Sequence, residues 1–289
     1  MLILTRLAMT TISNKGSAVA LTIAATAAVG VLSFWAYNKA TEIEDAATYP
    51  IARIFHSKDD ASKDVCEFIV ELAQDSIDKR GVFHLSVAGG SLLDLLTKLQ
   101  EYKNDVDWSK VTLSFANHKC VLPTSEKANM AKAKKKFADE LGITNIVAPT
   151  SKPVEGSDGT EEAKFYAKAL VDADIPHTQQ FPILDLVLLG LGADGHVGSC
   201  HPKGTAVRNN KDAVAGSKKT GEPSSITLTI SAMNHARQVA VIVCGGSKGK
   251  KEAVVRALRR PAERPCGIFP AQLLTSPTFF LDAEAAEGL

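Results

Sequence analysis

Short apolar runs that end in glycine or polar residues recur along the chain after residue 80. The clearest run covers residues 184–189, is apolar except for Asp185, and leads into Gly190, Gly192 and Gly195. A continuous apolar run of this length is typical of a strand buried on both faces of a mostly parallel sheet. Further strands are predicted at residues 82–87, 108–116, 239–243 and 278–281, and residues 225–231 alternate between apolar and polar like a strand.

Apolar residues at helical spacing separate these strands. A helix is expected after a cap at Ser57 or Ser62, and Gly81 is expected to end it. Further helices are predicted at residues 92–99, 125–141, 161–171 and 250–260. Alternating strands and helices predict an α/β fold, a mostly parallel sheet with helices on both faces. Residues 203–225 are polar without a period and predict a long surface loop that could close over a site.

The first part of the chain has a different character. Residues 16–38 carry no charge, and the stretch from Ala18 to Tyr37 has about the length of apolar chain that a bilayer-spanning helix needs. We therefore expect an N-terminal hydrophobic helix acting as a membrane anchor. A cleaved signal, an organelle-targeting presequence and a buried globular helix are the alternatives. The predicted organisation is an anchor or targeting segment with its linker at 1–45 and a folded domain at 46–289.

Composition excludes several function classes. The formal net charge is +1, so no overall basic field points to nucleic acid. Five cysteines occur without any C-x-x-C pair, which argues against a structural zinc site or a disulfide framework.

Candidate chemistry lies where the predicted strands end. His196 follows Gly195 and stands next to Asp194, and a histidine at such a strand end can move protons near neutral pH. A strand-to-helix turn with a solvated histidine is the structural alternative. Gly89, Gly90 and Ser91 follow another strand, in an arrangement that can hold a phosphate. Turns after parallel strands converge on one sheet edge, so Ser91, Lys119, His196 and Lys248 are expected to meet there.

Several motifs in order resemble one known family, the 6-phosphogluconolactonases, which share a fold with the glucosamine-6-phosphate deaminases. Residues 189–202 (LGLGADGHVGSCHP) are similar to the family's G-x-G-x-D-G-H-x-x-S-x-x-P. Residues 85–92 resemble its S-G-G-S phosphate turn, with Ala88 in place of the first serine. Residues 226–237 and 270–282 resemble the family's I-T-L-T segment and its P-A-x-L ending. The resemblance covers about residues 51–281.

The resemblance implies hydrolysis of 6-phosphogluconolactone to 6-phosphogluconate in the oxidative pentose phosphate pathway, with neither metal nor organic cofactor. His196 would be the general base, Asp194 would orient its ring, and backbone N–H groups around Gly195 or in the following turn would face the developing oxyanion. The implied substrate and phosphate ligands are Gly89, Gly90, Ser91, Asn117, Lys119, Lys248 and Arg237. Lys250 competes with Lys248, because the register of that segment is ambiguous.

One departure concerns the family's D-E-R triplet, which is replaced here by Asn117, His118 and Lys119. Asn117 cannot act as a base, which argues against the deaminase or isomerase chemistry of the relatives. Lys119 keeps the positive charge without the bidentate fork of arginine, and His118 is expected to be an exposed loop residue. A non-catalytic sugar-phosphate-binding protein of the same fold is therefore an alternative.

His201 replaces what is usually phenylalanine in the family and is expected to be a packed or solvated residue. The expected partner is a small phosphosugar lactone, with the chain a monomer or weak dimer and no nucleic acid bound. We expect the folded domain in the cytoplasm, tethered to a membrane through the segment from Ala18 to Tyr37; organelle or secretory-pathway targeting is the alternative.

Overall fold

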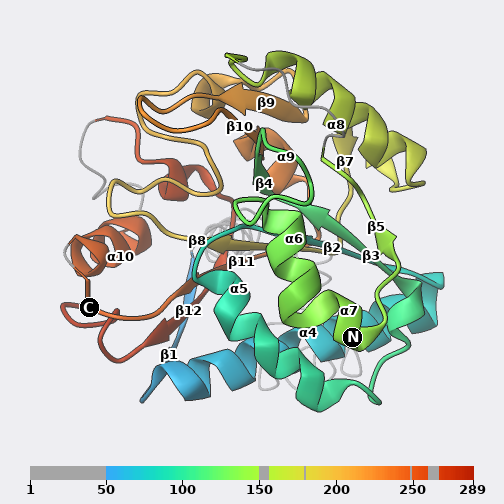
Figure 1. Ribbon diagram of the computed structural model, residues 1–289. Coiled ribbons are helices and arrows are strands. Elements are labelled where there is room, and N and C mark those ends of the chain that lie inside the picture. Colours follow the sequence, from blue (N-terminus) through green and yellow to red (C-terminus); the bar gives the residue numbers. More distant parts are fainter. Residues whose placement is uncertain (1–49, 150–155, 179, 248, 260–266) are drawn as a thin grey trace, which may run out of the picture. The chain divides into compact units, whose positions relative to one another are not determined.

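A computed structural model describes residues 50–149, 156–178, 180–247, 249–259 and 267–289 of the chain (Figure 1). They form a compact unit that spans Pro50–Leu289. The hydrophobic stretch from Ala18 to Tyr37 and the predicted boundary at residue 46 lie outside the described residues. Among the helices that are described, none is long and apolar enough to cross a membrane.

A sheet of seven parallel strands forms the centre of the described unit, in the order β1-β12-β11-β8-β2-β3-β5. The strand bounds are β1 Ile51–Phe55, β2 Phe83–Val87, β3 Val111–Phe115, β5 Asn145–Ile146, β8 Leu186–Gly190, β11 Gln238–Val243 and β12 Thr278–Asp282. Every residue of β2 and β3 is buried, although polar residues alternate with apolar ones in both strands (FHLSV and VTLSF). The predicted α/β fold with a parallel sheet is confirmed.

Helices cover the sheet on both sides (Figure 1). The longest, α4 (Lys58–Arg80), begins where the Ser57 side chain accepts a hydrogen bond from Asp60 N–H and ends at Gly81, in the left-handed conformation with φ 80°. The other described α-helices are α5 Leu92–Leu95, α6 Asn129–Ala133, α7 Asp139–Leu141, α8 Thr160–Asp172, α9 Ile230–Asn234 and α10 Lys250–Leu258. A 3-10 helix, Leu96–Tyr102, takes over directly after α5, so the first predicted turns after β2 are only partly α-helical.

A second, antiparallel sheet has the order β4-β10-β9, with β4 Asn117–Lys119, β9 Val214–Ser217 and β10 Ser225–Leu228. It lies with α9 on the side of the central sheet opposite α4 (Figure 1). The prediction of one long loop at residues 203–225 was wrong, because β9 falls inside it. This strand has no alternating pattern and is held by its pairing with β10. A two-stranded hairpin, β6 His177–Thr178 with β7 Phe181–Pro182, completes the described strands.

The amino ends of the central strands are joined by one buried carboxylate. Asp185 is 6% exposed and accepts hydrogen bonds from the backbone N–H of His84 at 2.8 Å and from Arg80 Nη2 at 2.7 Å. Arg237 Nε lies 3.1 Å from the same carboxylate. The single charged residue in the central apolar run therefore fastens β2, β8 and β11 at the edge opposite the strand-end turns.

Candidate functional site

A pocket of about 230 Å³ lies where the central strands end. Its walls come from the turns after β2, β8 and β11 and from the first residue of β4. Lining residues that carry chemistry are Gly89, Gly90, Ser91, Asn117, His196, Lys250 and Lys58. The predicted convergence of the strand-end turns is thus seen for Ser91 and His196, which are far apart in sequence. Lys248 lies outside the described residues.

The His196 ring is placed by a tight turn that needs glycine. Gly195 N–H donates to Gly192 O at 2.8 Å, and Gly192 N–H donates to His196 O at 2.9 Å, closing the loop on itself. A Cβ atom at Gly192 would stand 2.1 Å from the imidazole ring. Any side chain at Gly192 would therefore have to displace the ring of His196.

Gly195 has a second role in the same turn. Its φ of 86° is in the left-handed region, and a Cβ there would lie 2.3 Å from the ring of Phe269. Ala271 N–H donates to Gly195 O at 3.0 Å, so the segment before β12 closes over the turn. Because its own N–H is bonded to Gly192 O, Gly195 itself is not a free oxyanion donor; a donor from its neighbours or from the following turn stays a prediction.

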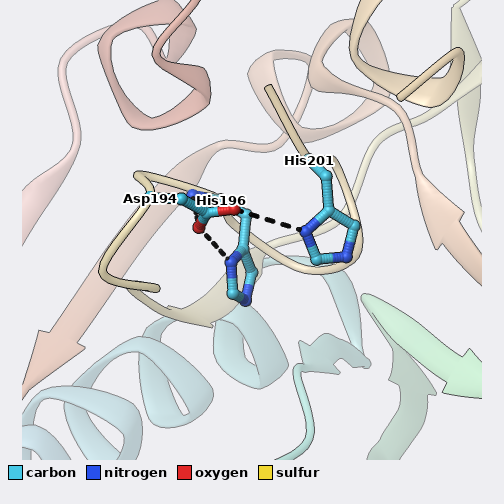
Figure 2. A group of neighbouring side chains, drawn as sticks. All are labelled: Asp194, His196 and His201. Carbon is cyan, nitrogen blue, oxygen red and sulfur yellow. Dashed lines mark hydrogen bonds and ion pairs between the residues drawn. The ribbon is translucent and has the colours of Figure 1, made fainter. Parts of the chain in front are cut away.

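Asp194 lies next to the ring of His196 (Figure 2) and is not among the residues that line the pocket. Its Oδ1 lies 2.5 Å from His196 Nδ1 and also accepts the backbone N–H of His196 at 3.2 Å. Partial burial opposes ionisation of the carboxyl, but the hydrogen bonds from His196 outweigh it and lower the pKa of Asp194. A ring that donates Nδ1–H to this carboxylate keeps the lone pair of its other nitrogen, Nε2, for accepting a proton.

The glycine turn after β2 forms the opposite wall. Gly90 has a φ of 91°, and the N–H of Gly89 donates to Asn117 Oδ1 at 3.0 Å. Within the described residues, the N–H groups of Gly90 and Ser91 have no acceptor, so these two are available to an anion. Gly89 therefore shapes the turn, and Gly90 and Ser91 offer the donors.

Two side chains that the sequence argument did not single out support this wall. Asn129, which is 6% exposed, donates to Asn117 O at 2.7 Å and packs where a Cβ of Gly89 would stand. Ser199 Oγ accepts a hydrogen bond from Asn117 Nδ2 at 3.0 Å. The serine of the D-G-H-x-x-S motif pointed to Ser199, whereas nothing distinguished Asn129 from the other polar residues of its lysine-rich segment.

The positive charges at the pocket differ from those expected. Lys119 does not line it; its Nζ lies 3.2 Å from a carboxylate oxygen of Glu222. Lys250, at the start of α10, lines the pocket, with its Nζ 3.5 Å from Cys244 O. Lys58, from the first turn of α4, also lines the pocket and was not anticipated.

Arg237 is not part of the site, which corrects the prediction that it binds phosphate. It precedes β11 and contacts Asp185 at the amino edge of the sheet, whereas the pocket is at the carboxyl edge. A residue before a parallel strand and a residue after it lie at opposite edges.

The expectation that His118 is exposed was also wrong. Its side chain is 0% exposed, packs edge-on against the Phe115 ring at 5.7 Å, and has Nδ1 2.6 Å from Lys119 O. In the three-residue strand β4 the outer two residues share one face and the middle one points inward. Burial lowers the pKa of His118 to about 4.

A second histidine lies beside the catalytic candidates (Figure 2). His201 Nδ1 is 3.7 Å from Asp194 Oδ2, and the rings of His201 and His196 are 4.5 Å apart between centroids. Burial, followed by the nearby His196, lowers the pKa of His201. The neighbouring Cys200 is fully buried with its Sγ 3.5 Å from Leu228 O, so the thiol faces away from both histidines.

A larger hollow, of about 750 Å³, lies between α8 and β9. Alanine and lysine side chains of α8 and the backbone of β9 form much of its wall, and it contains none of the predicted site residues. The smaller pocket, where a histidine held by a neighbouring carboxylate faces free backbone donors, has the chemistry of an active site.

Comparison with known proteins agrees with this geometry. The family described as glucosamine-6-phosphate isomerases/6-phosphogluconolactonase matches residues 56–278. Probable 6-phosphogluconolactonase 1 of Oryza sativa subsp. japonica is 30% identical over 271 residues, covering 87% of this chain and 90% of the relative. The chloroplastic 6-phosphogluconolactonase 3 of Arabidopsis thaliana is 30% identical over 236 residues, covering 78% of this chain and 71% of the relative.

Solved structures extend the likeness to the fold. The 6-phosphogluconolactonase of Trypanosoma cruzi superposes with a TM-score of 0.70 at 23% identity, covering 84% of this chain and 98% of that one. A monomeric glucosamine-6-phosphate deaminase gives a TM-score of 0.64 at 16% identity, covering 82% of this chain and 98% of that one. At these identities the likeness establishes the fold, which both kinds of enzyme share.

Proposed function

Because the chain belongs to the glucosamine-6-phosphate isomerase/6-phosphogluconolactonase family, we propose that it hydrolyses 6-phosphogluconolactone to 6-phosphogluconate. The observation that carries the proposal is the contact between His196 and Asp194 at a pocket whose opposite wall is a glycine turn. The same pocket has an asparagine, Asn117, at the position where the deaminase relatives are expected to carry an aspartate base. Lactone hydrolysis therefore suits the site better than deamination.

In this mechanism His196 acts as the general base. Nε2 takes a proton from water as the water oxygen attacks the lactone carbonyl, and Asp194 stabilises the imidazolium that forms. The carbonyl–ring oxygen bond then breaks, and the proton passes from Nε2 to the departing ring oxygen. The products are a carboxylic acid and a free hydroxyl, which balances the addition of one water.

The substrate phosphate would lie at the other end of the pocket. We assign it to the N–H groups of Gly90 and Ser91 and to the ammonium groups of Lys250 and Lys58. Lysines act here as point charges without a fixed fork. Holding the phosphate at a distance from His196 places the lactone ring between the two walls.

The proposal is tested by following lactone hydrolysis by the full-length chain above the spontaneous rate. Replacing His196 by alanine should lower kcat by about 10²- to 10⁴-fold, the usual contribution of a general base. The matched control is His235→Ala, an exposed histidine after α9. A wild-type chain that binds 6-phosphogluconate without accelerating hydrolysis would instead be a non-catalytic binding protein, and the proposal would be abandoned.

For residues 1–45 we propose a targeting or tethering role. The uncharged stretch from Ala18 to Tyr37 supports this role, and two kinds of address are compatible with it: a membrane tether on a cytoplasmic domain, or an organelle. The relatives named as chloroplastic support the second. Fluorescent fusions with and without residues 1–45 distinguish a membrane tether from an organelle address. Identical diffuse distributions of the two fusions would contradict both roles.

A further inference from the structure

Asp194 lies between two imidazole rings, of which the mechanism uses one. Its Oδ1 lies 2.5 Å from His196 Nδ1, and its Oδ2 lies 3.7 Å from His201 Nδ1 (Figure 2). The side chains are partly open to solvent, with exposed fractions of 51% for Asp194, 35% for His196 and 26% for His201. One donor atom from each residue lies within 4.8 Å of the other two.

Two imidazole nitrogens and one carboxylate oxygen are the donors of an open zinc site, in which solvent takes the fourth position. Bonds of about 2.0–2.2 Å in a tetrahedron place ligand atoms roughly 3.3–3.5 Å apart. The 2.5 Å and 3.7 Å separations lie on either side of that value, so small rotations of the carboxylate and the rings satisfy both. Magnesium and calcium are disfavoured because they prefer all-oxygen ligands.

We propose that Asp194, His196 and His201 bind Zn²⁺, or a similar transition metal such as Co²⁺, and that the bound ion inhibits the chain. The three ligands lie within eight consecutive residues, so little chain entropy is lost in bringing them together. Both histidines are already held by their backbones: Gly192 N–H bonds to His196 O, and Gly204 N–H bonds to His201 O at 2.9 Å.

The inhibition follows from the tautomer of His196, and this step depends on the proposed function. Without metal, Nδ1 carries the proton and Nε2 is the base. A metal ion on Nδ1 takes the lone pair of that nitrogen, and the ring proton then resides on Nε2. The nitrogen that has to accept a proton from water becomes a donor, and hydrolysis stops.

The decisive variant is His201→Phe, which removes one ligand and introduces the residue that the family resemblance suggests at this position. His201 has no assigned part in hydrolysis, so this variant should keep its activity. His235→Phe is the matched control, because it makes the same exchange at an exposed histidine outside the loop. Both are made in the full-length chain and freed of metal with a chelator.

Binding is measured first, without reference to activity, by titrating Co²⁺ and following its visible absorption, with Zn²⁺ displacing it. We expect one ion per chain for wild type and His235→Phe, and affinity at least 10- to 100-fold weaker for His201→Phe, since changing only an outer partner of a ligand costs that much. Zn²⁺ should also inhibit lactone hydrolysis by wild type at least tenfold, with recovery on chelation, and leave His201→Phe active.

Absence of binding by wild type, or equal binding by His201→Phe, would overturn the site. Binding that disappears in His201→Phe while hydrolysis of wild type is unaffected by Zn²⁺ would overturn the inhibition. If wild type proves to have no lactonase activity, the proposed function fails, and the Co²⁺ titration still decides whether the site exists.

Discussion

Acid should destabilise the folded chain through His118, the buried histidine of β4. A neutral ring that donates Nδ1–H to Lys119 O leaves Nε2 as the atom to be protonated. Within the described part of the chain, Nε2 is buried without a hydrogen-bond partner. Protonating it would therefore create a charge in an apolar environment, next to the Phe115 ring.

The size of the effect follows from the pKa. Burial lowers the pKa of His118 from the ordinary 6.5 to about 4. Between these values the unfolded chain binds a proton that the folded chain does not, so stability falls as pH falls from 6.5 and the loss levels off near pH 4. At about 1.36 kcal/mol per pH unit, the full loss is of the order of 3 kcal/mol.

The assay is urea unfolding at a series of pH values between 7 and 4, comparing wild type with His118→Asn. Asparagine places an N–H near the position of Nδ1 and does not titrate, so the variant should lose about 3 kcal/mol less over this range than wild type. His56→Asn, at an exposed histidine, is the control and should follow wild type. Parallel curves for wild type and His118→Asn would refute the reasoning, because acid unfolding would then come from other groups.

Two further predictions concern the pocket and the opposite edge of the sheet. Gly192→Ala puts a Cβ against the ring of His196 and should lower kcat by about 10²-fold or more while the chain stays folded. A near-normal kcat would mean that the turn adapts to the added Cβ without displacing the His196 ring. Lys250→Met should raise KM about tenfold for the phosphorylated lactone and leave the unphosphorylated lactone unaffected, whereas Arg237→Ala should lower stability by about 1 kcal/mol without changing KM. The reverse pattern of KM effects would exchange the roles of the two basic residues.

The central strands could be predicted from the sequence because their burial leaves a simple signal. Strands covered on both faces consist mainly of apolar residues: β8 and β11 are nearly continuous apolar runs, and in β2 and β3 apolar residues alternate with polar residues that are buried as well. The contact between Asp194 and His196 could also be predicted, because the two residues are separated only by Gly195, whose positive φ turns the chain sharply.

The outermost strand of the central sheet could not be predicted from its sequence. All but the last residue of β1 are exposed, with Ile51 at 61% and Ile54 at 55%, because β1 is the outermost strand and pairs only with β12. Its sequence, IARIF, shows neither a continuous apolar run nor a clean alternation, so nothing in it distinguishes a strand from a connection. Strands of this kind are specified by their partner, which the local sequence does not contain.

The replaced triplet, residues 117–119, shows that resemblance to a family predicts where a residue lies more reliably than what its side chain does. The three residues form one short strand in which Asn117 supports the glycine turn, His118 belongs to the core, and Lys119 is paired with Glu222. Each role depends on a neighbour that the family motif does not include. Among the described residues, the charges that we propose for the phosphate are those of Lys250 and Lys58, which line the pocket from the first turns of α10 and α4. Since both are flexible point charges rather than one bidentate fork, phosphate recognition in this chain should depend more on salt concentration than on exact geometry.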